Sequence, residues 1–184
     1  MKMKMNSGYI AECGLLLALA VIAAYVEMLI PVDLMLPGIK AGLANCVILF
    51  ILYRMGPLQA MMISLLRTMI MAFAFTSPAV LIYSFSGALI SIIIMTALSK
   101  SKAFSVYGVS MAGGVSHNIT QLIAASYFML SSGSSLSDLL TYYLPILIFS
   151  GIAAGIFNAI IADILIKRIP QKKDRIKEDK CTHI

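Results

Sequence analysis

The interpretation of this chain starts from one stretch, residues 113–121, which reads GGVSHNITQ. It lies within a segment of otherwise apolar and small residues, about 107–130. On a helix, His117 and Gln121 are four residues apart and share a face, and Asn118 lies beside them. Five polar residues within six positions are unusual in a soluble core. In a membrane helix, such a cluster indicates a functional site.

The composition identifies the surroundings of this stretch. The chain has 184 residues, of which 60% are hydrophobic and 12% charged, and its mean hydropathy is +0.95. An ordinary soluble domain is about 25% charged. A helix that crosses a bilayer needs about 20 apolar residues, so this length accommodates about six crossings. We therefore expect a single membrane domain with no soluble domain attached.

The predicted fold is an all-α integral membrane protein with six transmembrane helices. Residues 1–8 form a short cytoplasmic N-terminus, residues 9–166 the membrane domain, and residues 167–184 a basic cytoplasmic tail. Turn residues such as Pro, Gly and Ser separate the apolar runs. These runs place the six spans at about 9–30, 40–53, 58–75, 79–98, 106–130 and 142–166.

The basic residues predict the orientation of these spans. If the N-terminus is cytoplasmic, the internal segments hold twelve of the fourteen Lys and Arg residues. Basic residues favour the cytoplasmic side of a membrane. We therefore expect a plasma-membrane protein with both termini inside. The tail anchors this orientation, and it would also suit the anionic lipids of the inner leaflet.

One basic residue, Arg67, falls in the middle of a span. It lies 13 residues beyond Arg54, which corresponds to about 20 Å along a helix from the inner surface. His117 lies 15 residues beyond Lys102, or about 22 Å from the same surface. Two independent spans thus place a polar group at a similar height in the outer half of the membrane.

Other polar residues reach the same height from the first two spans. Lys40 and Asn45 enter with the second span, and Glu27 and Asp33 lie near the outer end of the first. This layout predicts a pocket open to the outside. Arg67 and Lys40 would suit an anionic group of the ligand, and amide and imidazole groups would fix its orientation. The candidate substrate-binding residues are Lys40, Asn45, Arg67, His117, Asn118 and Gln121.

Two structural alternatives stay open for these residues. Arg67 and Glu27 could form a buried ion pair that holds two helices together. The polar residues of 117–121 could equally form hydrogen bonds between helices, with no role in binding.

Small residues recur at four-residue spacing in the first and last spans. Such spacing permits close contact between membrane helices, either within the chain or with a partner. In the first span the candidates for contact with a partner helix are Gly14, Ala18, Ala20 and Ala24. The last span has the same spacing at Gly151, Gly155 and Ala159, which could serve packing within the chain or contact with a partner. Asp163 and Lys167, also four apart, predict a local ion pair.

Several chemical motifs are missing from the sequence. It has no Gly-rich nucleotide loop ending in Lys and Ser or Thr. It has no cluster of aspartates that would hold magnesium and a diphosphate. The three cysteines, Cys13, Cys46 and Cys181, have no metal-ligand spacing. We therefore expect no enzyme activity, no metal, no cofactor and no nucleic-acid partner.

The sequence resembles a known family across about residues 10–165. The matching stretches include an H-N-x-x-Q motif at 117–121 and an upstream K-x-x-L-A-N motif at 40–45. Further matches lie at 37–39, 66–67, 86–91, 108–116, 142–145 and 150–151. The family is the one described as heptaprenyl diphosphate synthase component I, or Gx transporter. It is similar to the substrate-binding S components of energy-coupling factor (ECF) transporters.

This resemblance implies a six-helix S-component-like bundle whose outward pocket is capped by the loop between the first two spans. It also implies that small residues of the first helix contact an energising transmembrane subunit, which carries two ATPase subunits. The substrate would be a small anionic or amphipathic metabolite, such as a vitamin or an isoprenoid- or quinone-related precursor. The alternatives are a non-catalytic membrane subunit of polyprenyl diphosphate or quinone synthesis, a stand-alone secondary transporter, and a membrane subunit of a redox assembly.

Overall fold

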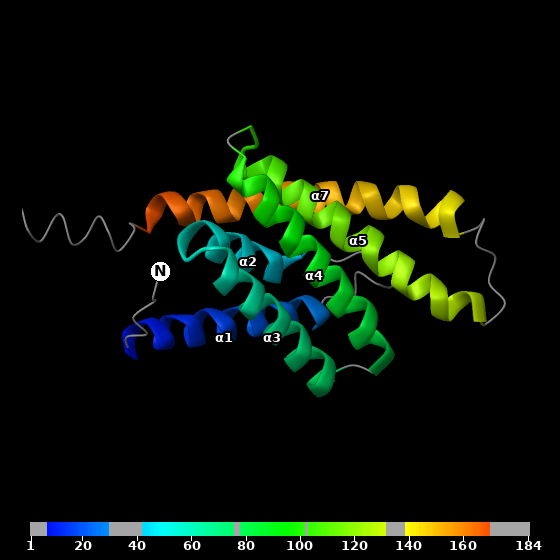
Figure 1. The fold of residues 1–184 in the computed structure, drawn as a ribbon, viewed down its shortest axis with the longest axis horizontal. Coiled ribbons are helices and arrows are strands. Elements are labelled where there is room, and N and C mark those ends of the chain that lie inside the picture. The colour runs from blue at the N-terminus through cyan, green and yellow to red at the C-terminus, as the bar shows by residue number, and fades with distance from the viewer. Residues whose placement is uncertain (1–6, 30–41, 76–77, 102, 132–138, 170–184) are drawn as a thin grey trace, which may run out of the picture.

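The computed structural model describes residues 7–29, 42–75, 78–101, 103–131 and 139–169 (Figure 1). Within these ranges the chain contains six α-helices, one turn of π-helix and no strand, so the predicted all-helical class is confirmed. The elements, in chain order, are α1 (Ser7–Leu29), α2 (Leu43–Arg54), α3 (Pro57–Phe75), α4 (Pro78–Lys100), α5 (Val106–Ser131), η2 (Leu139–Tyr143) and α7 (Leu144–Arg168).

Four of the described helices are long and apolar enough to cross a membrane. They are α1, α3, most of α4, and α7 together with the end of η2. Helix α5 has 26 residues, but its polar stretch from Ser116 to Gln121 makes it less apolar. Helix α2 has 12 residues, about 18 Å of helix against a hydrocarbon core of about 30 Å. The protein is thus a helical membrane protein, and the count of six crossings remains a prediction.

The turn between α2 and α3 follows the expected local chemistry. Helix α2 ends at Arg54, and Gly56 adopts a positive φ of 111°, which a residue with a Cβ rarely tolerates. Pro57 then begins α3, where its missing N–H costs no hydrogen bond. This turn returns the chain through the bundle in a few residues.

The helices form a ring in which α2 joins α1 to α7. Helix α5 packs between α4 and α7, α3 packs on α4 and α1, and α2 contacts α1, α3 and α7. The start of α1 and the end of α7 lie at the same end of the bundle (Figure 1). That arrangement fits an even number of crossings, while the side of the membrane on which this end lies remains a prediction.

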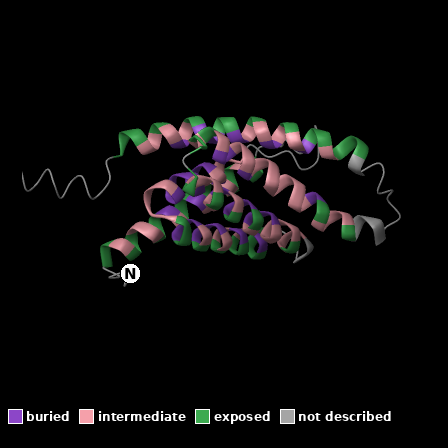
Figure 2. Ribbon diagram, turned by 45° about the horizontal axis from the view of Figure 1, so that its top comes forward, coloured by how far each residue is buried: buried purple, intermediate pink, exposed green. Residues whose placement is uncertain are grey.

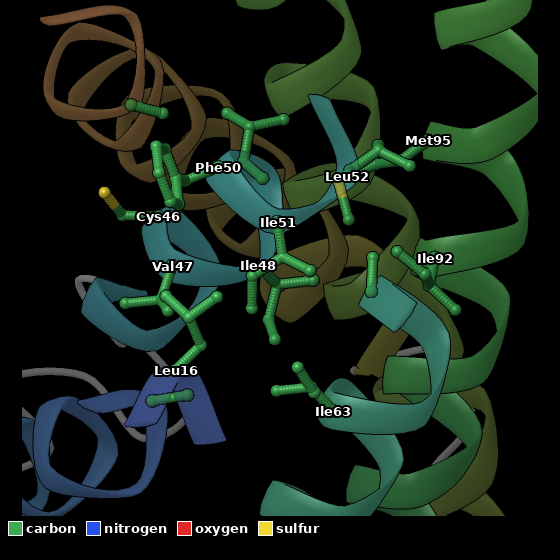
Figure 3. Packing of buried hydrophobic residues seen from close by; sticks show 14 of the residues in the cluster. Leu16, Cys46, Val47, Ile48, Phe50, Ile51, Leu52, Ile63, Ile92 and Met95 are labelled. Carbon is green, nitrogen blue, oxygen red and sulfur yellow. The ribbon is translucent and has the colours of Figure 1, made fainter. Parts of the chain in front are cut away.

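The core of the bundle is built around α2. Every residue from Cys46 to Leu52 is buried, as expected for a helix that is apolar on all sides. Its side chains meet Ile63 of α3 and Ile92 of α4 (Figure 3). Buried positions gather in the middle of the bundle (Figure 2). Large apolar side chains such as Phe73 and Phe149 are instead exposed, as expected for faces that contact lipid.

Glycines bring α5 and α7 into backbone contact. A Cβ at Gly114 would lie 2.5 Å from the carbonyl oxygen of Gly151, and a Cβ at Gly155 would lie 2.6 Å from the Cα of Met111. Real Cβ contacts are never this short. Gly151, Gly155 and Ala159 are all buried. The small residues of the last span therefore serve packing within the chain, one of the two uses that their spacing allowed.

Arg54 ties three helices together at the end of the bundle where α1 begins, which we call the Arg54 end. Its Nε lies 3.7 Å from Glu12 Oε1 of α1, and its Nη1 donates a 3.0 Å hydrogen bond to the carbonyl of Ile169, just after α7. The guanidinium also lies 5.7 Å from the ring centre of Phe50. Nearby on α7, Lys167 and Asp163 form the predicted ion pair at 2.6 Å.

Candidate functional site

A polar cavity of about 70 Å³ lies among α1, α2, α3, α5 and α7. All five helices contribute side chains, and most of the lining residues are either polar or very small. They are Glu27, Gly42, Asn45, Arg67, Gly114, His117, Asn118, Gln121, Gly151, Ala154 and Asn158.

Helix α5 supplies one continuous stripe of this lining. Gly114, His117, Asn118 and Gln121 stand at positions i, i+3, i+4 and i+7, which share a helix face. Asn118 Nδ2 donates a 2.9 Å hydrogen bond to the carbonyl of Leu147 on α7. Gln121 Nε2 lies 3.4 Å from Ser84 Oγ on α4. The neighbouring helices thus hold both amides in place beside the cavity.

Gly87 of α4 lets this stripe approach closely. A Cβ at Gly87 would lie 2.8 Å from Gln121 Cγ and 3.2 Å from His117 Cε1. The absence of a side chain therefore sets where the His117 and Gln121 side chains lie. Gly87 does not line the cavity itself. Its role is to position His117 and Gln121, which do.

Arg67 enters the cavity from α3. Its Nε is buried and has no hydrogen-bond partner among the described residues. Glu27 of α1 lies close enough to interact with Arg67 electrostatically. A buried guanidinium group normally satisfies its donors with protein groups or water. The guanidinium group that lines the cavity thus includes a buried donor that the described residues do not use.

Glu27 also joins α1 to the start of α2. Its Oε1 accepts a hydrogen bond from the backbone N–H of Gly42, the residue that precedes α2. Gly42 has a positive φ of 73°, and its carbonyl accepts a 2.7 Å hydrogen bond from the N–H of Asn45. A Cβ at Gly42 would lie 2.8 Å from Asn158 Nδ2. Glycine is thus required here by both conformation and space.

Helix α7 closes the cavity with Gly151, Ala154 and Asn158, at positions i, i+3 and i+7. Asn158 is almost completely buried, at 3% exposure. Sequence reasoning assigned Asn158 no role. A signal was present, because Asn158 lies seven residues after Gly151 and therefore on the same face.

The structure brings together five of the six candidate binding residues from the sequence: Asn45, Arg67, His117, Asn118 and Gln121. Lys40 and Asp33 lie outside the described residues. Glu27 joins the lining and interacts with Arg67, as the ion-pair alternative anticipated. Arg67 and His117 line one cavity. This agrees with the similar heights that helix rise gives for them.

The four candidate partner-contact residues of α1 separate into two groups. Gly14 and Ala18 are exposed, with nothing within 4 Å of a Cβ at Gly14, and Ala24 is half-buried. Ala20, by contrast, is completely buried in the core of the chain. The Ala20 side chain therefore faces the bundle interior and does not lie on the outer surface of the described chain.

The long apolar helices define a class, the helical membrane proteins, and here a polar cavity lies between the helices. Comparison with family models gives the family itself. The model described as heptaprenyl diphosphate synthase component I matches residues 16–165, and the chain belongs to this family. Comparisons with curated proteins and with solved structures found no match. The predicted family is confirmed, and the similarity to ECF S components remains a prediction.

Proposed function

We propose that this chain is the substrate-binding membrane component of an ECF-type transporter. In this role it captures a small metabolite from outside the cell, and ATP-driven partner subunits supply the work of uptake. The observation that carries the proposal is the Arg67 side chain, whose buried Nε lacks a partner among the described residues and whose position lines a polar cavity. A purely structural arginine would have its donors satisfied by the protein.

The lining suggests how an occupant is held. Arg67 offers a planar fork of donors for an acidic group, while Asn45, Asn118 and Gln121 provide amides that orient a polar ligand. His117 can donate or accept a hydrogen bond. A cavity of about 70 Å³ is far below the roughly 300–1,000 Å³ of sites for drug-sized ligands. The occupant is a small metabolite or the polar end of an amphipathic one.

The outer face of α1 supplies the partner surface in this proposal. Gly14 and Ala18 are exposed on one face of the helix, and the half-buried Ala24 lies further along it. Small residues permit close approach of another membrane helix. The partner is an energising transmembrane subunit that carries two ATPase subunits. In this proposal the Arg54 end faces the cytoplasm of the cell, because basic residues favour that side of the membrane.

A second candidate function follows from the family description. Component I of a heptaprenyl diphosphate synthase would be a membrane subunit that supports a separate synthase. In that role the chain has no catalytic residues of its own, and the cavity holds the polar end of a prenyl lipid. The two candidates differ in partner: ATPase subunits for the first, a prenyl synthase for the second.

Affinity purification from the native host tests the proposal. The tagged chain is solubilised in mild detergent, and the proteins that co-purify are identified by mass spectrometry. A transmembrane subunit with two ATPases supports the transporter. Capture of a prenyl synthase instead supports the second candidate. If neither partner is captured, both candidates are contradicted and a stand-alone carrier remains.

Two matched variants in the same purification test whether the outer face of α1 is the partner surface. Ala18→Leu places a bulky side chain on the proposed contact face of α1 and is expected to prevent capture of the transmembrane subunit. Ala153→Leu makes the same change at an exposed position of α7 and is expected to leave capture unchanged. Equal capture by both variants would exclude the α1 face as the partner surface.

A further inference from the structure

The charges that line the cavity balance one another. Among the described residues, its titratable side chains are Glu27 from α1, Arg67 from α3 and His117 from α5, while α2 and α7 contribute only amides and small residues. With the carboxylate and the guanidinium ionised and the imidazole neutral, the lining carries no net charge.

Local contacts surround the Glu27 carboxylate with groups that suit a negative charge. Its Oε1 accepts a hydrogen bond from the N–H of Gly42 at the start of α2, where the positive end of a helix dipole favours an anion. It also interacts with the Arg67 guanidinium. A hydrogen bond to the carboxylate and a nearby cation both favour its charged form.

This balance disfavours an ion as the occupant. An added anion or cation would leave one uncompensated charge inside a membrane protein, where an unpaired charge is costly. A ligand whose own charges sum to zero leaves the balance intact and can meet both Arg67 and Glu27.

Three hydrogen-bonding groups of the cavity are also separated by type. Arg67 only donates. Asn118 uses Nδ2 to donate to the Leu147 carbonyl, and because a carbonyl cannot donate, this contact fixes the orientation of the amide. The group that Asn118 can offer to an occupant is then Oδ1, an acceptor. Among Arg67, Asn118 and Glu27, the donor thus lies on α3 and the acceptors lie on α5 and α1.

From these observations we propose that the cavity selects a zwitterion, with the acidic group on Arg67 and an ammonium group facing Glu27 and Asn118 Oδ1. This inference rests on the proposed function of the cavity as a substrate site. It deepens that function by naming the substrate class, and it speaks against a multiply charged prenyl diphosphate as the occupant.

Three matched probes test the charge balance: glycine, acetate and methylammonium, the last two being the halves of the first. Each is titrated at pH 7 and constant ionic strength into the full chain in detergent, and the unfolding midpoint is followed, because a ligand that binds the folded state raises it. Wild type is expected to bind glycine at least about tenfold more tightly than either ion.

Two variants should change this preference in opposite directions. Glu27→Gln leaves Arg67 unbalanced and is expected to tighten acetate binding about tenfold or more. Arg67→Gln leaves Glu27 unbalanced and is expected to tighten methylammonium binding by a similar factor. Glu12→Gln removes the same charge about 22 Å away on α1 and should change neither. If one cavity variant does not fold, the other decides the test alone.

The proposal is overturned if wild type binds acetate or methylammonium as well as glycine. It is also overturned if none of the three probes binds wild type, or if the folded cavity variants keep the wild-type preference. These outcomes are independent of the affinity purification. Capture of ATPase subunits alongside a failed probe test would preserve the transporter and reject only the zwitterion.

Discussion

The bundle contains two pairs of an arginine and a glutamate, and each pair takes its glutamate from α1. At the Arg54 end, Arg54 meets Glu12, the carbonyl of Ile169 and the ring of Phe50. At the cavity, Arg67 interacts with Glu27, while its buried Nε has no hydrogen-bond partner in the described part of the chain. The same pair of residue types thus occurs in two different environments.

The difference lies in how fully each arginine is used by the protein. Arg54 closes contacts among α1, α2 and the end of α7, which is the arrangement of a structural clasp. Arg67 lines a cavity beside His117 and four amide side chains, and we propose that it binds the occupant. Residue type and helix position do not distinguish the two arginines, whereas the buried Nε of Arg67 without a partner among the described residues does.

Replacement of Arg67 by Met is expected to have the largest effect on binding. The change keeps the length of the side chain and removes its charged donors, which contribute about 1.5–3 kcal/mol per hydrogen bond, or at least about a tenfold loss of affinity. The measurement is the rise in unfolding midpoint when a metabolite extract of the native host is added. Arg54→Met is the control and should keep the full rise; equal responses would contradict the distinction between the two arginines.

Arg54→Met is expected to affect stability instead. Arg54 is 11% exposed and joins three helices, so loss of its contacts should lower the free energy of unfolding by about 1–2 kcal/mol. Chemical unfolding in mixed micelles measures this change. An unchanged free energy of unfolding in Arg54→Met would contradict the structural role of Arg54.

Gly87→Ala tests the positioning of the cavity residues. The added Cβ would meet Gln121 Cγ at 2.8 Å and His117 Cε1 at 3.2 Å, so these side chains must shift. We expect weaker stabilisation by the host extract, about a tenfold loss of affinity, with the fold kept. Gly14→Ala is the control, because nothing lies within 4 Å of its Cβ. An unchanged response for Gly87→Ala would show that the α4–α5 contact does not govern binding.

The smallest effect is expected at the Asp163–Lys167 pair. Lys167 is exposed, and exposed pairs of this spacing contribute little to stability. Lys167→Ala should therefore leave both the unfolding midpoint and the response to host extract unchanged. A loss of stability as large as that of Arg54→Met would contradict this ranking of the two ion pairs.

Much of this arrangement could be predicted from the sequence. Apolar runs and turn residues gave helices close to their observed bounds, including the turn at Gly56 and Pro57. Helix rise placed Arg67 and His117 at one height, and the structure places both on one cavity. These predictions rest on local periodicity and length, which a single sequence contains.

The rest depends on how each helix is rotated in the bundle. Helix α1 is apolar on most sides, so its sequence did not reveal that Ala20 faces the core while Ala18 faces outward. The positions of Asn158 and Gly87 beside the cavity residues became apparent only from the helices packed against them. Whether Arg67 binds a ligand or only forms an ion pair likewise depends on the side chains around it, which the sequence does not give.

Native mass spectrometry of the intact protein, after incubation with host metabolite extract and buffer exchange, tests the binding role of the cavity most directly. Wild type and Arg54→Met are expected to retain the same small molecule, and Arg67→Met to retain none. Equal retention by all three proteins, or no small molecule on wild type, would contradict the assignment of this cavity as the substrate site.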